Sequence, residues 1–168
     1  AAEALRESEG RLKRAQEIAH LGSWELDVEN NVLIWSDEVY RIFGFEPRQF
    51  RVTYETFLGF IHPDDRQAVD NAYRESIHSN KDTYEIQHRI VRPDGKIRVV
   101  HEKCEHIRDS SGNIIRSNGM VHDMTDRVRI EEELRKSRDE LDLRVRERTD
   151  ELRSRTEQLT KLSSQMTL

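Results

Sequence analysis

The sequence of 168 residues has one cysteine, three prolines and no long apolar run. The single cysteine, Cys104, can form neither an internal disulfide nor a cage of thiolates around zinc, a pattern typical of a reducing compartment. The chain lacks the roughly 18 consecutive apolar residues that a membrane span needs, and its first residues lack the apolar stretch of a signal peptide. We therefore expect a cytoplasmic protein with no membrane span in this chain.

Basic residues are too few for a protein that binds nucleic acid. Lys and Arg number 28 against 33 Asp and Glu, a formal net charge of -5, whereas a nucleic-acid binder presents a basic face. Charged residues make up 36% of the chain and apolar residues only 35%, which is more polar than a typical globular domain. Part of the chain should therefore be elongated and solvated.

The tail, residues 126–168, is the part that fits this description. It contains no glycine or proline, and 22 of its 43 residues are charged. With Val145 at heptad position a, seven of ten seam positions are apolar, which indicates a coiled coil. The apolar seam residues are Leu134, Leu141, Val145, Leu152, Leu159, Leu162 and Met166, and the polar ones are Arg138, Arg148 and Arg155. We expect a parallel homodimer, and the alternative is one solvated helix stabilised by its ion pairs.

The rest of the chain divides into a helix and a globular domain. Residues 1–21 predict an amphipathic helix with Gly22 as its stop, and residues 22–125 alternate β-branched and aromatic runs with turn residues. Expected strands cover residues 23–28, 32–35, 83–92, 96–109 and 114–124. Short helices are expected from Ser36, Thr53 and Asp64, since each can cap a helix start. This order predicts an antiparallel α+β domain between two flanking helices.

Six segments of this domain, in this order, resemble a PAS domain. They are residues 21–25 (LGSWE), 35–38 (WSDE), 43–47 (FGFEP), 62–66 (HPDDR), 89–95 (RIVRPDG) and 119–127 (GMVHDMTDR). The last is similar to the D-x-T signature of the PAC-type segment that ends the domain, and the whole resemblance covers residues 20–127. It implies a PAS fold, with a five-stranded antiparallel sheet in the order 2-1-5-4-3 and short helices on one face.

The junction between the domain and the tail is a candidate relay site. Thr125 is suited to cap the tail helix, and Asp126 lies in its first turn, where the helix dipole favours an anion. The resemblance implies that the Asp of the D-x-T signature, Asp123, ties the strand end to a nearby Arg. We assign Asp123, Thr125, Asp126 and Arg127 to this junction, and the alternative is a well-capped helix with no relay role.

Three histidines form a candidate ligand site. Pairing the last three strands outward from their turns places His88 opposite His101, and His101 opposite His122. Cross-strand neighbours lie within about 5 Å, so a row of imidazoles could hold a ligand or couple a pH change to the strands. The alternatives are a register shift that moves one histidine to the other face, or separate bonds to neighbours. We assign no metal site.

The resemblance also implies a central cavity lined by aromatic residues, of which Trp35, Tyr40 and Phe43 are candidate ligand-binding residues. The cofactor stays open between haem and another small ligand. Flavin photochemistry is disfavoured, because Cys104 does not lie in the Asn-Cys-Arg-Phe string of the light-sensing branch of the family.

Residues 143–149 (LRVRERT) and 162–168 (LSSQMTL) are similar to linkers in bacterial sensor histidine kinases. This resemblance implies a non-catalytic sensory and signal-relay module of a two-component sensor histidine kinase, with the kinase or another output domain following in cis. No Gly-rich phosphate loop occurs, so we expect no enzyme activity in this chain. The alternatives are a dedicated receptor for a small molecule, metal or haem, or the PAS module of a cyclic-dinucleotide synthase or transcription regulator.

Overall fold

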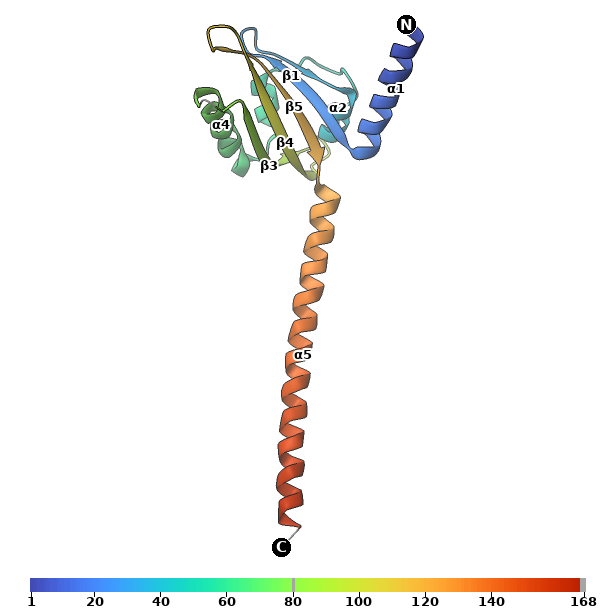
Figure 1. Cartoon of the computed structure of the whole chain (residues 1–168), viewed down its shortest axis with the longest axis vertical. Coiled ribbons are helices and arrows are strands. Elements are labelled where there is room, and N and C mark those ends of the chain that lie inside the picture. The colour runs from blue at the N-terminus through green and yellow to red at the C-terminus, as the bar shows by residue number, and fades with distance from the viewer. Residues whose placement is uncertain (80, 167–168) are drawn as a thin grey trace. The chain divides into compact units, whose positions relative to one another are not determined.

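The structure is a computed structural model that describes residues 1–79 and 81–166, so residues 167 and 168 of the predicted tail lie outside the described residues. The chain forms two compact units, Ala1–Thr125 and Asp126–Leu168. The helices are α1 (Ala2–Ala19), α2 (Asp37–Phe43), α3 (Tyr54–Phe60), α4 (Pro63–His78) and α5 (Thr125–Gln165) (Figure 1). The strands are β1 (Leu21–Asp27), β2 (Val32–Trp35), β3 (Thr83–Val91), β4 (Ile97–Arg108) and β5 (Ile114–Asp123).

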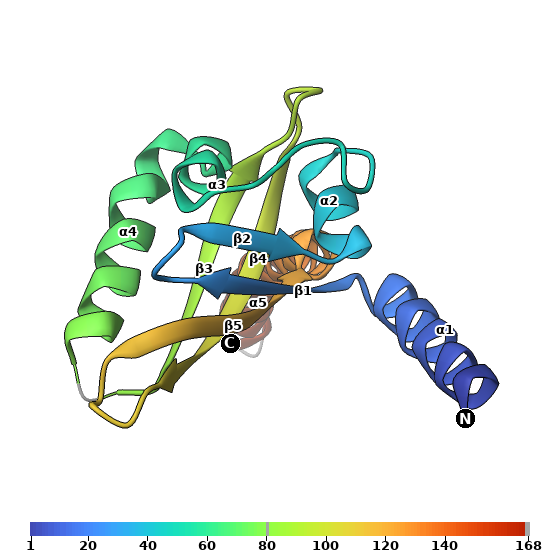
Figure 2. The same ribbon diagram turned by 90° about the horizontal axis from the view of Figure 1, so that it is seen from above.

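The five strands form one antiparallel sheet in the order β2-β1-β5-β4-β3, which confirms the order implied by the PAS resemblance. Helices α2, α3 and α4 cover one face of this sheet (Figure 2). Burial alternates along β4, where Val100, Glu102, Cys104 and His106 are buried and their neighbours are not. This period of two fixes the covered face of the sheet, which carries the core.

The start of α2 and α3 follows the predicted hydroxyl positions, with one difference. Thr53 Oγ1 accepts a hydrogen bond from the N–H of Thr56 at 3.2 Å and so caps α3. Ser36 precedes α2, but its hydroxyl accepts from the N–H of Ser23 at 3.0 Å instead of capping the helix. Gly44 ends α2 with φ of 88°, a left-handed conformation that glycine adopts without strain.

Gly22 does not stop the first helix, contrary to the sequence prediction. Helix α1 ends at Ala19, and His20 supplies the left-handed residue with φ of 50°. Gly22 lies in β1, where a Cβ atom would overlap Val39 Cγ2 and lie 2.9 Å from the Val39 nitrogen. The glycine is therefore needed for the close approach of α2 to β1.

Helix α4 is fastened to β3 at its first turn. His62 Nδ1 accepts a hydrogen bond from the N–H of Asp64, and Pro63 occupies the first helical position. The Asp65 carboxylate accepts from the backbone N–H of Arg89 at 2.8 Å and from its guanidinium at 2.6 and 2.9 Å. These bonds to Arg89 lower the pKa of Asp65 to about 2. Residues 62–66 and 89–95, two of the segments that resemble the PAS family, meet in this contact.

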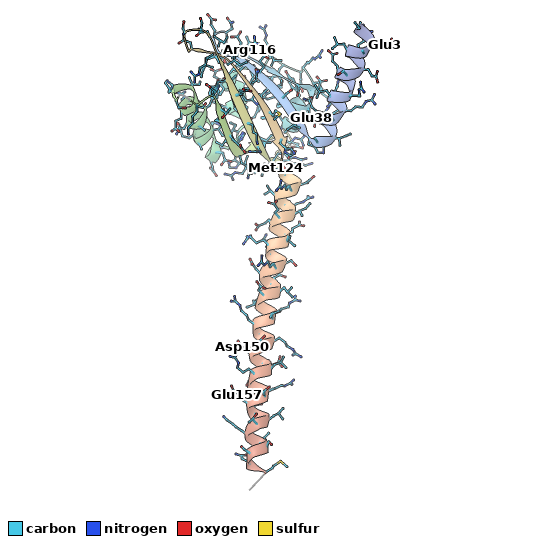
Figure 3. The ribbon with its side chains drawn as sticks, viewed as in Figure 1. Glu3, Glu38, Arg116, Met124, Asp150 and Glu157 are labelled. Carbon is cyan, nitrogen blue, oxygen red and sulfur yellow. The ribbon has the colours of Figure 1, made fainter. Side chains whose placement is uncertain are left out.

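Helix α5 is continuous over 41 residues and buries none of them within its own chain. Its side chains project on all sides along its length, with Asp150 and Glu157 on the same side (Figure 3). Ion pairs within the helix join Arg127 to Glu131 at 2.8 Å and Arg148 to Glu151 at 2.8 Å. All seven apolar seam residues are at least half exposed. Among the described residues, no helix has both the length and the apolar character to cross a bilayer.

Candidate functional site

The candidate relay site is the end of β5, where two side chains join the adjacent strand to the first residue of α5. The Asp123 carboxylate accepts hydrogen bonds from the backbone N–H of Thr125 at 3.0 Å and from its hydroxyl at 2.5 Å. Thr125 Oγ1 in turn accepts from the backbone N–H of Val99, in β4, at 3.0 Å. A backbone bond from Met124 to the Val99 carbonyl at 2.8 Å lies beside it. A displacement of β4 would therefore displace Thr125 through these hydrogen bonds.

Two details of the junction differ from the prediction or extend it. Thr125 does not cap α5 but is its first residue, and its N–H and hydroxyl both donate to the Asp123 carboxylate. The Arg partner implied for Asp123 is Arg98 of β4, 3.6 Å away. Asp126 and Arg127 form ion pairs inside α5, with Arg129 and Glu131 respectively.

The hydroxyl of Thr125 should contribute measurably to the free energy of unfolding of the first unit. Thr125→Val keeps the side-chain shape but leaves the Val99 N–H without its acceptor, so we expect a loss of about 1 kcal/mol in the free energy of unfolding. Urea unfolding, with hydrogen exchange at the Val99 amide, measures it. Thr156→Val is the matched control, because the Thr156 hydroxyl donates to the Leu152 carbonyl of its own exposed helix. Equal losses in both variants would contradict this role of Thr125.

The predicted row of three histidines is wrong. In the β3–β4 ladder His88 lies opposite Val100, and His101 lies opposite Gln87, one residue away from the expected register. His101 does lie opposite His122, as expected. The histidines therefore separate, with His88 on the helix-covered face and the other two on the opposite face.

The cause of the shift is the turn between β3 and β4. The Arg92 N–H donates to the Lys96 carbonyl at 2.9 Å, so the pair closes a three-residue loop in place of the two-residue loop that was expected. Gly95 has φ of 79° and donates its N–H to the Arg92 carbonyl. A three-residue hairpin loop with a left-handed glycine at its last position is a common solution, and it moves the register by one.

His88 instead forms a buried pair with Glu102 of β4. The His88 Nε2 atom lies 3.6 Å from Glu102 Oε1, and the two side chains are 1% and 2% exposed. Burial disfavours the imidazolium, but the carboxylate of Glu102 outweighs it and raises the pKa of His88. The Nδ1 atom lies 3.4 Å from the Arg89 carbonyl, so both ring nitrogens face oxygen atoms and suit a protonated ring.

Glu102 also lines a small cavity in the core. The other lining residues are Trp24, Leu26, Leu33, Trp35, Val39, Phe43, Tyr54, Phe57, Tyr73, Tyr84 and Val121. The space open to the centre of a water molecule is about 20 Å³, against roughly 10–15 Å³ for one water, so haem or flavin does not fit beside these side chains as they stand. Within residues 1–79 and 81–166, Glu102 Oε2 and Trp24 Nε1 are buried and have no hydrogen-bond partner.

Of the three aromatic candidates, two line this cavity and one does not. Trp35 and Phe43 line this cavity, with ring centroids 4.6 Å apart. Tyr40 does not line it, and its hydroxyl donates to the Phe50 carbonyl at 3.0 Å. Glu102 was missed from the sequence, although its place two residues after Val100 in an alternating strand marks it as inward-facing.

Cys104 is buried, and its burial raises the thiol pKa to about 12, so it stays protonated near neutral pH. Within the described part of the chain, no three His, Cys, Asp or Glu side chains are grouped so as to hold a metal ion.

The sheet order, the helices on one face, the core cavity and the bonded strand end together define a PAS domain, a sensory module of signalling proteins. The chain belongs to this family, since a family model described as PAS fold matches residues 32–121. Among curated proteins, the sensor protein FixL of Bradyrhizobium diazoefficiens is 25% identical over 115 residues, which is 68% of this chain and 22% of that protein. The methyl sulfide methyltransferase-associated sensor of Methanosarcina acetivorans is 27% identical over 89 residues, 53% of this chain and 9% of that protein.

Solved structures agree with this family. A sensory box histidine kinase/response regulator from Burkholderia thailandensis superposes with a TM-score of 0.64 and 30% identity, covering 78% of this chain and 97% of that one. The N-terminal domain of a diguanylate cyclase with a PAS/PAC sensor from Marinobacter aquaeolei has a TM-score of 0.58 at 17% identity, covering 62% and 95%. The latter shares the fold alone. The chain spans less than a quarter of the length of the curated relatives above.

Proposed function

We propose that this chain is a non-catalytic sensory and signal-relay module of a cytoplasmic two-component sensor histidine kinase. It pairs with a second copy and passes a change in its PAS core through α5 to a kinase domain in cis. The observation that carries the proposal is the apolar stripe of α5, which is exposed along a 41-residue helix that starts two residues after Asp123, the bonded end of β5. The similarity to a sensor protein and a histidine kinase supports the output.

The heptad register favours parallel pairing of two α5 helices. Seven apolar seam residues would leave water only through such a contact, and each fully buried leucine contributes about 1.5–3 kcal/mol. In a parallel pair the flanking g and e positions would join Ile130 to Arg135, Ser137 to Asp142, Arg144 to Thr149, Glu151 to Thr156, and Gln158 to Ser163. None of these pairs brings like charges together, so parallel pairing meets no repulsion there.

Three arginines in the seam explain how such a pair could switch. Arg138, Arg148 and Arg155 would face their own copies across the seam, and like charges there destabilise a single tight register. Two packings of similar free energy allow a small bias at Thr125 to select one of them. The seam is therefore suited to a relay rather than to a static clamp.

Helix α1 offers a second apolar surface for pairing within the first unit. It has no buried residue, and ion pairs from Lys13 to Asp37 at 2.7 Å and from Glu17 to Arg41 at 2.9 Å connect it to α2. Leu5 and Leu12 are both more than half exposed. A second copy of the chain would cover these leucines.

Insertions in α5 of the full-length protein test the relay. Seven residues inserted after Arg146 add nearly two whole turns and restore the seam, whereas two residues rotate the downstream part of the helix by about 200°. We expect regulated autophosphorylation to survive the seven-residue insertion and to be lost with two. Equal behaviour of the two insertions would contradict relay through the coiled coil, and absence of autophosphorylation in the parent would contradict the kinase output.

A second candidate function, a receptor for a small molecule, rests on the two unpartnered atoms beside the cavity, Glu102 Oε2 and Trp24 Nε1. A guest that accepts one hydrogen bond and donates another would satisfy both, and a guest larger than one water would require the lining side chains to move apart. Mass spectrometry of the protein purified under native conditions tests this function, because a receptor should retain a bound molecule whereas a relay module should have the mass of the chain alone.

A further inference from the structure

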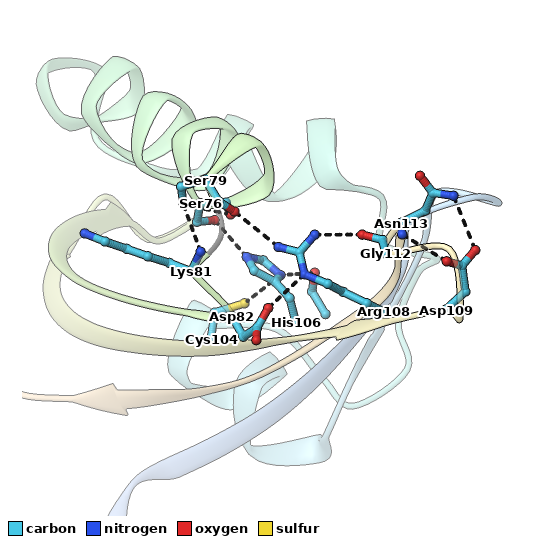
Figure 4. Close-up of polar contacts among 11 residues, drawn as sticks. Ser76, Ser79, Lys81, Asp82, Cys104, His106, Arg108, Asp109, Gly112 and Asn113 are labelled. Carbon is cyan, nitrogen blue, oxygen red and sulfur yellow. Dashed lines mark hydrogen bonds and ion pairs between the residues drawn. The ribbon is translucent and has the colours of Figure 1, made fainter.

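A closed ring of hydrogen bonds joins the C-terminal half of α4 to the sheet. His106 Nε2 lies 2.8 Å from Ser76 Oγ (Figure 4). His106 Nδ1 lies 2.8 Å from Ser117 Oγ. The Ser117 hydroxyl is 3.1 Å from the Tyr73 hydroxyl, and the Ser76 hydroxyl donates to the Tyr73 carbonyl at 2.6 Å. His106 is 5% exposed, so water cannot replace a lost partner without a rearrangement.

One arrangement of protons satisfies the ring. Since Ser76 donates to a carbonyl, its oxygen is free to accept, and His106 Nε2 must carry the proton. His106 Nδ1 then accepts from the Ser117 hydroxyl, whose oxygen accepts from Tyr73. Every hydroxyl of this network has a strong oxygen or nitrogen acceptor for its hydrogen only while His106 is neutral.

A second proton on His106 would break this arrangement. Nδ1 would become a donor pointing at the Ser117 oxygen, and the Ser117 hydrogen would have to turn toward Tyr73 or toward the Cys104 sulfur. The first choice leaves the Tyr73 hydrogen without an acceptor, and the second exchanges a nitrogen acceptor for a weak sulfur acceptor. The weak acceptor Cys104 Sγ, at 3.8 Å from Nδ1, is the only other group near that nitrogen among the contacts of the described residues.

The groups that face His106 from the neighbouring elements disfavour its protonated form. Tyr84 of β3 stacks on the ring at 6.2 Å, and Tyr73 of α4 contacts its edge at 5.9 Å. Burial lowers the pKa of His106, and the cation of Arg108 lowers it further, while Asp82 opposes them. Arg108 is itself held by Asp82 at 2.8 Å and donates to the Ser79 carbonyl just after α4 (Figure 4).

We propose that the proton is an input of this sensory module, and that His106 is the site that binds it. Protonation of the imidazole breaks the hydrogen-bond network that links Ser76 and Tyr73 of α4 to Ser117 of β5. Acid therefore loosens the C-terminal end of α4, while the bonds between Asp65 and Arg89 keep its N-terminal end attached to β3. The idea that the proton is an input to a relay rests on the proposed function. The proton-binding site itself does not depend on any output domain.

The sign of the effect follows from the position of the pKa. His106 has a folded pKa below its ordinary value of 6.5, so the folded state disfavours the proton and stability falls as pH falls below 6.5. For one such group the folding equilibrium constant changes at most about tenfold per pH unit. His88 acts in the opposite direction, since its raised pKa gives stability that is present below 6.5 and lost as pH rises through the folded value.

His106→Gln separates the two histidines. The glutamine amide can donate to Ser76 and accept from Ser117 as the neutral imidazole does, but it does not titrate. From about pH 7.5 to about pH 5.5, the unfolding constant of the wild type should rise several-fold relative to that of His106→Gln. His122→Gln, which removes an imidazole from the uncovered face of the adjacent strand, should keep the wild-type pH dependence.

Two measurements on the wild-type chain test the same inference without a substitution. The ring signal of His106 in an NMR titration should report a pKa below 6.5, and the amides of Ser76 and its neighbours should exchange faster once the ring is protonated. A His106 pKa at or above 6.5, or equal pH dependence of the wild type and His106→Gln, would overturn the inference. Neither result involves the kinase, so the proposed relay could survive the loss of its acid input.

Discussion

Replacing Leu141 and Leu152 by lysine should dissociate the proposed dimer into monomers. Both residues occupy the apolar seam of α5 and are 60% and 52% exposed in the single chain. The double variant removes both leucines of each chain from the proposed dimer interface and places ammonium groups there, so the dissociation constant should rise at least about a hundredfold. Sedimentation velocity over a range of concentrations measures this change.

Leu143→Lys is the control for this prediction. Leu143 is 57% exposed on the same helix, but it lies outside the seam in the predicted register. The variant should therefore remain a dimer while carrying the same change in charge per site. If Leu143→Lys dissociates the protein as strongly as the seam variant, the heptad register is wrong. If neither variant changes the sedimentation coefficient, the helix does not form the interface.

His88→Leu should destabilise the first unit by about 3 kcal/mol near pH 6.5, because removal of one partner leaves a buried carboxylate without its cation. Glu102 has one oxygen near His88 and one without any partner among the described residues, so the substitution leaves both unsatisfied. Adding Glu102→Leu should recover most of the loss, since an apolar pair of similar size replaces the ion pair. Urea unfolding of the two single variants and the double variant gives the coupling between the residues.

The effect should also depend on pH in a defined direction. His88 has a raised folded pKa, so its contribution to stability is present below 6.5 and is lost as pH rises through the folded value. The gap between wild type and His88→Leu should therefore narrow in alkaline buffer. Additive losses in the double variant, with no coupling, would contradict a functional pair of His88 and Glu102.

The boundaries of the strands were predictable because turn residues separate the strands clearly, whereas their order in the sheet was implied by the PAS resemblance. Ser110 to Asn113 and Asn30 to Asn31 lie between strands whose bounds differ from the prediction by a few residues at most. Segments 62–66 and 89–95 meet in the Asp65–Arg89 contact, which gives a physical reason for that part of the resemblance.

The face of the sheet on which His88 lies could not be predicted in the same way. It depends on whether the loop before Lys96 has two or three residues, and Gly95 allows the longer loop through its positive φ. A sheet has a side-chain period of two, so this single residue moved His88 from one face to the other. The pairing of Glu102 with His88, and of His106 with two serines, followed only from the observed register and packing.

Side-chain hydroxyls were equally ambiguous in the sequence. The sequence predicts that Ser36 and Thr125 each cap a helix, yet one hydroxyl bonds β1 and the other bonds β4. A hydroxyl can accept from any nearby N–H, and the tertiary fold decides which one is nearest. The junction role of Thr125 therefore depends on the packing of Val99 beside it.

Oxidative cross-linking of Val145→Cys is the most direct test of parallel pairing through α5. In a parallel pair in register, the two copies of residue 145 face each other within disulfide distance, whereas residue 143 points outward. Cys104 does not compete, because it is buried and burial raises its thiol pKa to about 12. We predict that Val145→Cys forms a covalent dimer rapidly and that Leu143→Cys does not. Absence of a cross-link in Val145→Cys, or equal cross-linking of both variants, would contradict the account.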